Sequence, residues 1–174
     1  TAPIDLSRYE SIPDSADVVV IAAPQAGFEA RDVEKLRRYL EKSDGSVVLF
    51  LEPFRRHNLD DLLFDWGILA EEAVIIDPGS DYQAASGHLI LRRFAEHPIT
   101  QSLVDNRLYV YSDRPSPVRM DPGSPRVVGV ERTPLIGTSE TSWVEMNFRD
   151  EDVPKFTQGR DIRGPVPVAA LSER

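Results

Sequence analysis

The chain has no cysteine among its 174 residues. It therefore offers no thiol nucleophile, no disulfide framework and no thiolate ligand for a metal ion. It also lacks the run of about 18 apolar residues that a membrane-spanning helix needs, and it shows no signal-peptide pattern. Because the first residue is Thr1 rather than Met, we expect the chain to be an excised or processed piece of a longer protein.

Basic residues are few compared with acidic ones. Lys and Arg number 20 and Asp and Glu number 29, which gives a net charge of −9. The basic clusters are pairs such as Arg37–Arg38 and Arg92–Arg93. Because phosphates are bound by concentrated Lys and Arg, the sequence argues against nucleic acid and against an anionic lipid surface as the main partner.

The familiar motifs of catalysis and cofactor binding are missing as well. The sequence has no G-x-S-x-G nucleophile elbow, no G-x-G-x-x-G and no G-K-[ST] phosphate loop. The three histidines, His57, His88 and His97, are scattered, and Asp77 and Asp121 each precede a proline, as in ordinary turns. We therefore predict no enzymatic activity, no cofactor and no metal site.

The clearest structural pattern lies in the first third of the chain. Ala16–Pro24 and Ser46–Pro53 are continuous apolar, β-branched runs, which are typical of strands covered on both faces of a parallel sheet. Between them, Val33, Leu36 and Tyr39 recur at the spacing of one helix face. Strand, helix and strand in this order predict a βαβ unit.

The pattern continues and then weakens. Asn58–Gly67 reads as a short helix that Asn58 caps and Gly67 ends, and Ala73–Asp77 reads as a third strand. Four later segments predict strands without helices between them: HLILRRF, RLYVYS, RVVGVERT and VPVAAL. We expect one α/β domain over residues 1–174, with a mainly parallel sheet that antiparallel strands extend.

One stretch, TPLIGTSETSWVEMN, is rich in small hydroxyl residues. Thr138, Ser139, Thr141 and Ser142 precede Trp143, and such residues commonly bond nearby backbone groups in loops. We predict an ordered loop that Trp143 anchors to the core or to a partner.

A second candidate segment is the proline-rich loop from Arg114 to Arg126. Trp and Arg are enriched where binding energy concentrates, so a binding surface built from both segments is predicted at Thr138, Ser139, Trp143, Arg114 and Arg119.

The carboxyl ends of the predicted parallel strands offer an alternative site, because α/β folds bind ligands at that edge. Pro24–Phe28, Glu52–Arg56 and Pro78–Tyr82 fall there, and Glu52 is our candidate ligand contact. A hydrolase or transferase acting in this crevice is the alternative to a binding domain.

Several segments taken together resemble one family. They are SIPDSADVVVIAAPQAGFEARDVEKLRRYLEKSDGSVVLFLEP, then LDDLLFDWGI followed by VIIDP, then HPIT, the TS and SWVE of the hydroxyl-rich stretch, and the closing GPVPVAAL. Their order and spacing resemble the GldG-like, gliding-motility-type auxiliary proteins of ABC transporters, the ABC-type uncharacterised transport domain. The resemblance covers about Ile12 to Leu171.

This resemblance implies an extracytoplasmic, periplasmic domain of a bacterial inner-membrane protein, held by membrane segments outside this chain and associated with an ABC permease and ATPase. It also implies a three-layer sandwich of the flavodoxin-like or class I glutamine amidotransferase-like kind. Those amidotransferases use a cysteine, so their activity is not carried over. Since similar domains occur beside sugar-processing enzymes, a carbohydrate-binding role is a further alternative.

Overall fold

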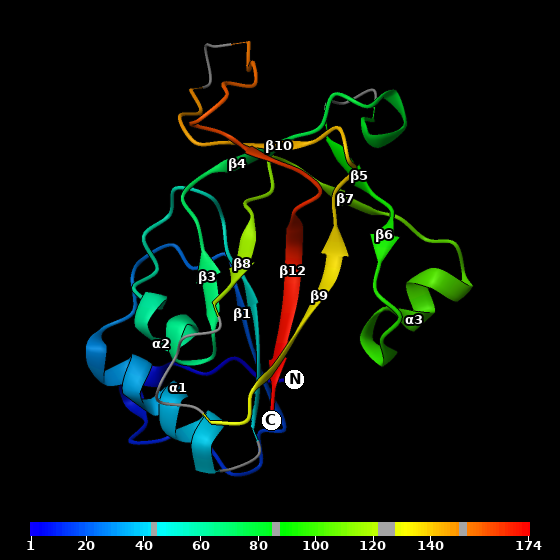
Figure 1. The fold of residues 1–174 in the computed structure, drawn as a ribbon. Coiled ribbons are helices and arrows are strands. Elements are labelled where there is room, and N and C mark those ends of the chain that lie inside the picture. The colour runs from blue at the N-terminus through cyan, green and yellow to red at the C-terminus, as the bar shows by residue number, and fades with distance from the viewer. Residues whose placement is uncertain (43–44, 85–87, 122–127, 150–152) are drawn as a thin grey trace. The chain divides into compact units, whose positions relative to one another are not determined.

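A computed structural model describes residues 1–42, 45–84, 88–121, 128–149 and 153–174 of the chain (Figure 1). Its contacts divide the chain into two compact units, Thr1–Leu62 and Leu63–Arg174. The predicted loop from Arg114 to Arg126 lies partly outside the description, because residues 122–127 do not belong to the described ranges.

The first unit contains the predicted βαβ element. Its parts are η1 (Leu6–Arg8), β1 (Val18–Ala22), α1 (Ala30–Lys42) and β2 (Ser46–Phe50). β1 and β2 pair in parallel, in a register that runs from Val18 opposite Ser46 to Ala22 opposite Phe50. The prediction of a parallel βαβ unit is confirmed.

The expected apolar stripe of α1 is its buried face. Val33, Leu36 and Tyr39 are all buried, and the hydroxyl of Tyr39 donates to the carbonyl of Ala16 at 2.8 Å. This bond ties the second half of the helix to the residues that lead into β1. Ser46 N–H donates to Asp17 O, so the starts of the two strands are also joined.

The second unit is built from short strands. They are β3 (Ile68–Ala70), β4 (Val74–Ile76), β5 (Leu89–Leu91), β6 (Arg93–Phe94), β7 (Val110–Ser112), β8 (Val118–Met120), β9 (Glu131–Gly137), β10 (Trp143–Glu145), β11 (Ile162–Arg163) and β12 (Pro167–Glu173). β3 pairs with β8 and β5 with β7, while β11–β10–β4 and β12–β9–β6 form three-stranded sheets. Each of these pairs is antiparallel.

The prediction of a three-layer, mainly parallel, flavodoxin-like sandwich is wrong. Among the described residues the parallel pairing is confined to β1 and β2, and the remaining sheets are small and antiparallel. Ala73–Asp77 does form a strand, β4, but that strand pairs antiparallel with β10. A buried apolar run shows that a strand is covered and leaves the direction of its neighbour open, since that neighbour comes from a distant part of the chain.

The helices outside the βαβ unit are short. α2 (Asp60–Asp65) is the helix expected after Asn58, and Gly67 follows it with a φ of 68°, as a helix-ending glycine does. α3 (Pro98–Asp105) was not predicted. Among the described residues, no helix is both long enough and apolar enough to span a membrane.

The core of the second unit gathers residues from separate strands. Its buried cluster is Ala73, Ile75, Leu89, Val144 and Val166, with Val168 packed against it. The cluster joins β4, β5 and β10 to the residue that precedes β12. The hydroxyl-rich stretch predicted as a site connects β9 to β10, and it therefore lies against this core.

Candidate functional site

The loop between β9 and β10 is organised around the buried carboxylate of Asp77, which directly follows β4. Its Oδ1 accepts hydrogen bonds from the Ser139 hydroxyl at 2.8 Å, the Thr141 hydroxyl at 3.0 Å and Gly79 N–H at 3.2 Å. Its Oδ2 accepts from Ser139 N–H at 3.2 Å. Asp77 is 2% exposed, so these donors replace the water that a free carboxylate would bind.

The other two hydroxyls of the loop bind toward β12. Thr138 Oγ1 lies 2.7 Å from Ser142 Oγ and accepts from Val166 N–H at 2.9 Å, and the Ser142 hydroxyl donates to Ser139 O at 2.8 Å. Gly164 closes the arrangement, because its N–H donates to Ser142 O at 2.8 Å. The loop is thus ordered by its own hydroxyls, in agreement with the sequence prediction of a structured turn.

This arrangement sets the chemistry of Ser139. Its side chain is almost fully buried, and its hydroxyl is directed to Asp77 and Thr141. A serine nucleophile needs an accessible oxygen and a base that takes its proton. The contacts of Ser139 instead stabilise the fold, so the loop serves as a rigid support for the residue that follows it.

That residue is Trp143, the first residue of β10. It pairs with Ile76 of β4 and Arg163 of β11. Its ring meets the ring of Phe156 edge to face, with centroids 6.4 Å apart, and the guanidinium of Arg163 lies 4.1 Å from the Phe156 centroid. We call Trp143, Phe156 and Arg163 the aromatic–arginine surface.

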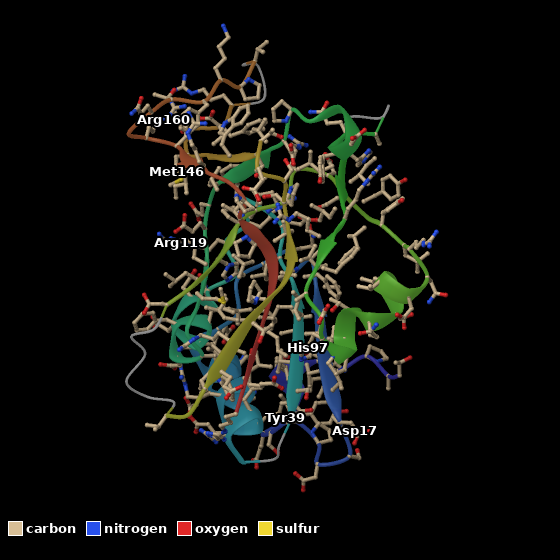
Figure 2. The ribbon with its side chains drawn as sticks, turned by 45° about the vertical axis from the view of Figure 1, so that its right-hand side comes forward. Asp17, Tyr39, His97, Arg119, Met146 and Arg160 are labelled. Carbon is tan, nitrogen blue, oxygen red and sulfur yellow. The ribbon has the colours of Figure 1, made fainter. Side chains whose placement is uncertain are left out.

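Trp143 is only partly buried, yet its indole nitrogen is covered. Nε1 is buried and finds no hydrogen-bond partner within the described part of the chain. Met146, which directly follows β10, and Ile162 of β11 are exposed at 41% and 37%, and Val153 is exposed at 82%. Apolar side chains are therefore exposed on this part of the second unit, where Figure 2 labels Met146 and Arg160 at the same end.

The segment that carries Phe156 is held by Arg160. Its guanidinium makes two hydrogen bonds to Asp161, at 2.8 and 3.0 Å, and one to Glu145 of β10 at 2.5 Å. Glu145 and Asp161 are both buried. Asp161 also accepts hydrogen bonds from Thr157 N–H at 2.6 Å and from Met146 N–H at 3.4 Å. One carboxylate therefore binds both the residue that follows β10 and the backbone next to Phe156.

These contacts change the acidity of Asp161. The hydrogen bond from Arg160 lowers the pKa of the Asp161 carboxyl below its ordinary 3.8, burial opposes this, and the backbone N–H groups of Thr157 and Met146 lower it further. A lowered folded pKa contributes stability above the unfolded pKa, and this stability is lost as the pH falls through the folded pKa.

We therefore expect the stabilising effect of Asp161 to depend on acid pH. The difference in unfolding free energy between the natural chain and Asp161→Asn should be constant from pH 5 to 7 and shrink below about pH 4. Urea unfolding followed by Trp fluorescence at several pH values measures it. Asp14→Asn, at an exposed aspartate, is the control and should show little difference; a gap that widens on acidification would contradict the assignment.

The remaining predicted residues make ion pairs with other residues. Arg119, on β8, forms an ion pair with Glu71, and Arg114 lies 3.6 Å from Asp113. Glu52 belongs to the first unit and pairs with Arg55 at 3.3 Å. The arginines that meet the Trp143 region are Arg160 and Arg163, which the sequence prediction missed because their positions depend on the pairing of β11 with β10.

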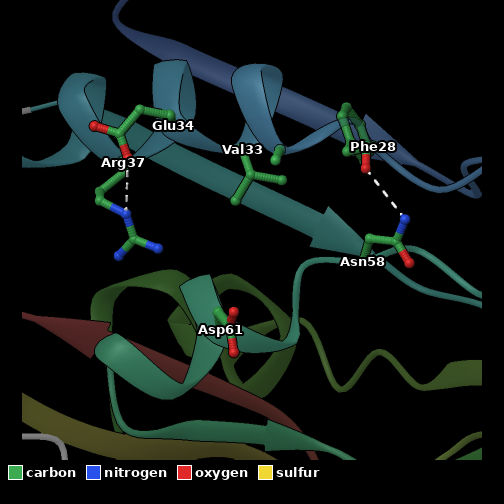
Figure 3. A pocket seen from close by; sticks show the side chains of 7 residues that line it. Phe28, Val33, Glu34, Arg37, Asn58 and Asp61 are labelled. Atoms are coloured by element: carbon green, nitrogen blue, oxygen red, sulfur yellow. Dashed lines mark hydrogen bonds and ion pairs between the residues drawn. The ribbon is translucent and has the colours of Figure 1, made fainter.

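A pocket of the first unit includes Phe28, one residue of the predicted strand-end crevice, but neither Glu52 nor any other residue predicted there. The pocket has a volume of about 270 Å³ and is lined by Phe28, Ala30, Val33, Glu34, Arg37, Asn58 and Asp61 (Figure 3). Within it, Arg37 pairs with Glu34 at 3.3 Å and the Asn58 amide donates to Phe28 O at 3.2 Å. Its lining carries two carboxylates, Glu34 and Asp61, and no hydroxyl, thiol or imidazole group.

Comparison of the coordinates with solved structures finds the fold in the mmIFT52 N-terminal domain, with a TM-score of 0.58 and 14% sequence identity. The match covers 76% of this chain and 62% of that domain, so the chain spans less than two thirds of its length. This likeness concerns the fold alone, and it supports the replacement of the flavodoxin-like prediction by a fold of small antiparallel sheets with few helices.

Two comparisons concern the sequence. No curated protein matches the chain. A family model described as "ABC-type uncharacterized transport system" matches residues 1–174, the whole of the sequence.

Proposed function

This chain belongs to the ABC-type uncharacterised transport system family of auxiliary domains, and from that premise we propose that it is a non-enzymatic docking domain. Its partners in this proposal are the permease and ATPase subunits of the transport system. The domain acts on the extracytoplasmic, periplasmic side of a bacterial inner membrane. A GldG-like role in gliding motility is the finer form of the same proposal.

The observation that carries the docking role is the aromatic–arginine surface. Trp, Phe, Met and Arg are enriched at the centres of protein interfaces. Here Trp143 meets Phe156 edge to face, Arg163 lies over the Phe156 ring, and Met146, three residues after Trp143, is exposed. The support beneath Trp143 is rigid, since the preceding loop is fixed by Asp77. A preorganised aromatic anchor loses less entropy on binding than a mobile one, which favours recognition.

The enzyme alternative finds less support in these contacts. A hydrolase or transferase would use one of the loop hydroxyls as nucleophile or as a substrate contact, but Ser139 and Thr138 are buried and bonded internally. The carbohydrate-binding alternative would use exposed aromatic rings as stacking platforms, whereas the face of Phe156 is occupied by Arg163.

The test is affinity purification of the tagged protein from its native membrane in mild detergent. We expect an ABC permease and ATPase in stable proportion, and we expect Trp143→Ala to weaken their binding about 30-fold or more, as for an interface hot spot. Tyr111→Ala, at an exposed aromatic of β7, is the matched control and should bind normally.

Two results would count against this proposal. Recovery of the protein alone from a soluble fraction would remove the transport partners. Unfolding of the Trp143→Ala variant, seen by circular dichroism, would identify Trp143 as a core residue. In that case Arg163→Ala, which removes an exposed side chain, decides whether the surface binds the partners.

A further inference from the structure

Two of the three histidines use the same ring nitrogen to hold the backbone at the start of a helix. His97 is the N-cap of α3, and its Nδ1 accepts a hydrogen bond from Ile99 N–H at 3.2 Å (Figure 2). His57 Nδ1 accepts from Leu59 N–H at 3.0 Å, one residue before α2 begins. Each bond joins two residues of the same compact unit, His97 in the second and His57 in the first.

An imidazole differs from the usual capping groups in its response to pH. Ser, Thr, Asp and Asn cap helices with a side-chain oxygen, which still accepts hydrogen bonds in weak acid. An imidazole accepts only on a nitrogen that carries no proton, and the imidazolium ion carries a proton on both nitrogens. Once the ring is protonated, no rotation of the side chain restores an acceptor. Histidine changes charge between about pH 5 and pH 8, so mild acid can remove such a cap.

A carboxylate lies near the other nitrogen of each ring. His97 Nε2 is 3.8 Å from Oε1 of Glu173 on β12, and His57 Nε2 is 4.0 Å from Oδ1 of Asp60. These distances are longer than hydrogen bonds, so the carboxylates attract the rings mainly when the rings are charged. The neutral ring is therefore held by the backbone N–H, whereas the charged ring is repelled by that donor and attracted to the carboxylate.

Other charged residues beside His97 leave Glu173 as the group that faces its Nε2. The positive side chains are engaged, since Arg93 of β6 forms an ion pair at 2.7 Å and Arg174 lies over an aromatic ring. The negative ones are Glu96, which precedes His97, and Glu131, which lies opposite Glu173 in the register of β9 and β12.

The charges beside His57 are mixed in sign. Glu29, from the segment that meets His57 through Phe28, pairs with Arg31 at 2.8 Å, and Arg55 pairs with Glu52 at 3.3 Å. The others are Arg56 and Asp61. All these charges favour or oppose the protonated ring, but none of them gives an imidazolium ion an acceptor.

We propose that protonation of His97 releases the start of α3, and that protonation of His57 releases Leu59 ahead of α2, so that each unit contains an acid-sensitive cap. The backbone of His97 stays in place, because its carbonyl accepts from Thr100 N–H at 2.9 Å and Gln101 N–H at 2.8 Å. The change is confined to the ring and to the N–H that it held. The acid-sensitive caps share no residue with the aromatic–arginine surface, so this inference is independent of the proposed function.

The experiment measures hydrogen exchange of single backbone amides in the full chain by NMR spectroscopy at pH 7.5 and pH 5.0, corrected for the intrinsic effect of pH on exchange. We expect the protection of the Ile99 and Leu59 amides to fall about 5-fold at the lower pH, as for the loss of one capping bond. The Ser7 amide is the matched control, because it donates to Asp5 Oδ1 at 3.0 Å over the same two-residue spacing. The hydrogen bonds from Ser7 keep the pKa of Asp5 below its ordinary value, so this acceptor stays ionised and the protection of Ser7 should not change.

Two variants assign the effect to the ring of His97. His97→Asn supplies a capping oxygen that does not titrate, so the Ile99 amide should be equally protected at both pH values while Leu59 still responds. Glu173→Gln removes the charge that favours the protonated ring, so the loss at Ile99 should need a lower pH than in the natural chain.

Three results would overturn the proposal. The first is an Ile99 amide whose protection in the natural chain is the same at both pH values. The second is an equal loss of protection at Ile99 in His97→Asn, which would place the pH response elsewhere. The third is loss of protection throughout β6 and α3 at pH 5.0, because the unit would then unfold as a whole instead of releasing one cap.

Discussion

Asp77→Asn should destabilise the second unit by about 2–4 kcal/mol, although the substitution hardly changes the shape of the side chain. Asp77 accepts on both oxygens, from three donors at Oδ1 and from Ser139 N–H at Oδ2. An asparagine amide places an NH₂ group at one of these positions, where it faces a donor. The buried N–H or hydroxyl groups on that side then lose their acceptor without gaining water.

Urea unfolding monitored by circular dichroism measures this loss. The matched control is Asp81→Asn, in the neighbouring turn η2 (Ser80–Tyr82), because Asp81 is exposed; it should change stability by less than about 0.5 kcal/mol. If Asp77→Asn were as mild as the control, the carboxylate would not be the organising group of the loop.

Gly164→Ala is expected to have an effect of similar size for a steric reason. A Cβ at this position would lie 2.0 Å from Ser142 Oγ, 2.8 Å from Ser139 O and 3.0 Å from Ser142 O. Two of these neighbours are backbone atoms that cannot rotate away. The loop must therefore shift and weaken its bonds to Asp77, at a cost of about 2–4 kcal/mol.

A second glycine and a double-mutant cycle separate this clash from the general effect of adding a methyl group. At Gly137, on β9, a Cβ would meet only Val166 O at 3.9 Å, so Gly137→Ala should be nearly neutral. Ser142→Ala removes the nearest atom, and its combination with Gly164→Ala should cost less than the sum of the two single changes by about 1 kcal/mol. Strict additivity would show that Ser142 Oγ is not the obstacle.

The βαβ unit could be predicted because its signals are local. The apolar runs of β1 and β2 and the spacing of Val33, Leu36 and Tyr39 each lie within one element, and short connections limit how the elements can pair. The direction of β4 could not be predicted in this way, since its partner β10 lies far along the chain. Parallel pairing in the first two strands therefore does not predict the direction of the strands that follow them.

Helix α3 was not predicted because the signals at its start are weak in the sequence. His97 accepts Ile99 N–H on Nδ1 at 3.2 Å and Pro98 occupies the first turn, so a histidine and a proline form the helix start. Proline is favoured at the first helical position, but a histidine cap is a weak signal in a sequence. The eight residues of α3 bury little, with Thr100 as the buried residue, and the apolar periodicity is correspondingly faint.

The candidate site was predictable in part. The hydroxyl-rich composition of residues 138–142 indicated a loop bonded to itself, and the contacts of Thr138 and Ser142 agree with that. The role of Asp77 as the hydrogen-bond acceptor of this loop could not be predicted, because an aspartate before a proline is already explained as an ordinary turn residue. Arg160 and Asp161 were missed for a similar reason: adjacent opposite charges are common on surfaces, and only the fold buries the carboxylate against β10.

The bond between Asp77 and Ser139 joins residues 62 positions apart. Closing a chain loop of this length costs about 3.7 kcal/mol in entropy, and the cost must be met before the hydrogen bonds contribute. We therefore expect these bonds to form after β4 and β10 have paired, late in folding. Interactions that form late act mainly on the unfolding rate, so Asp77 governs the lifetime of the folded unit more than the speed at which it forms.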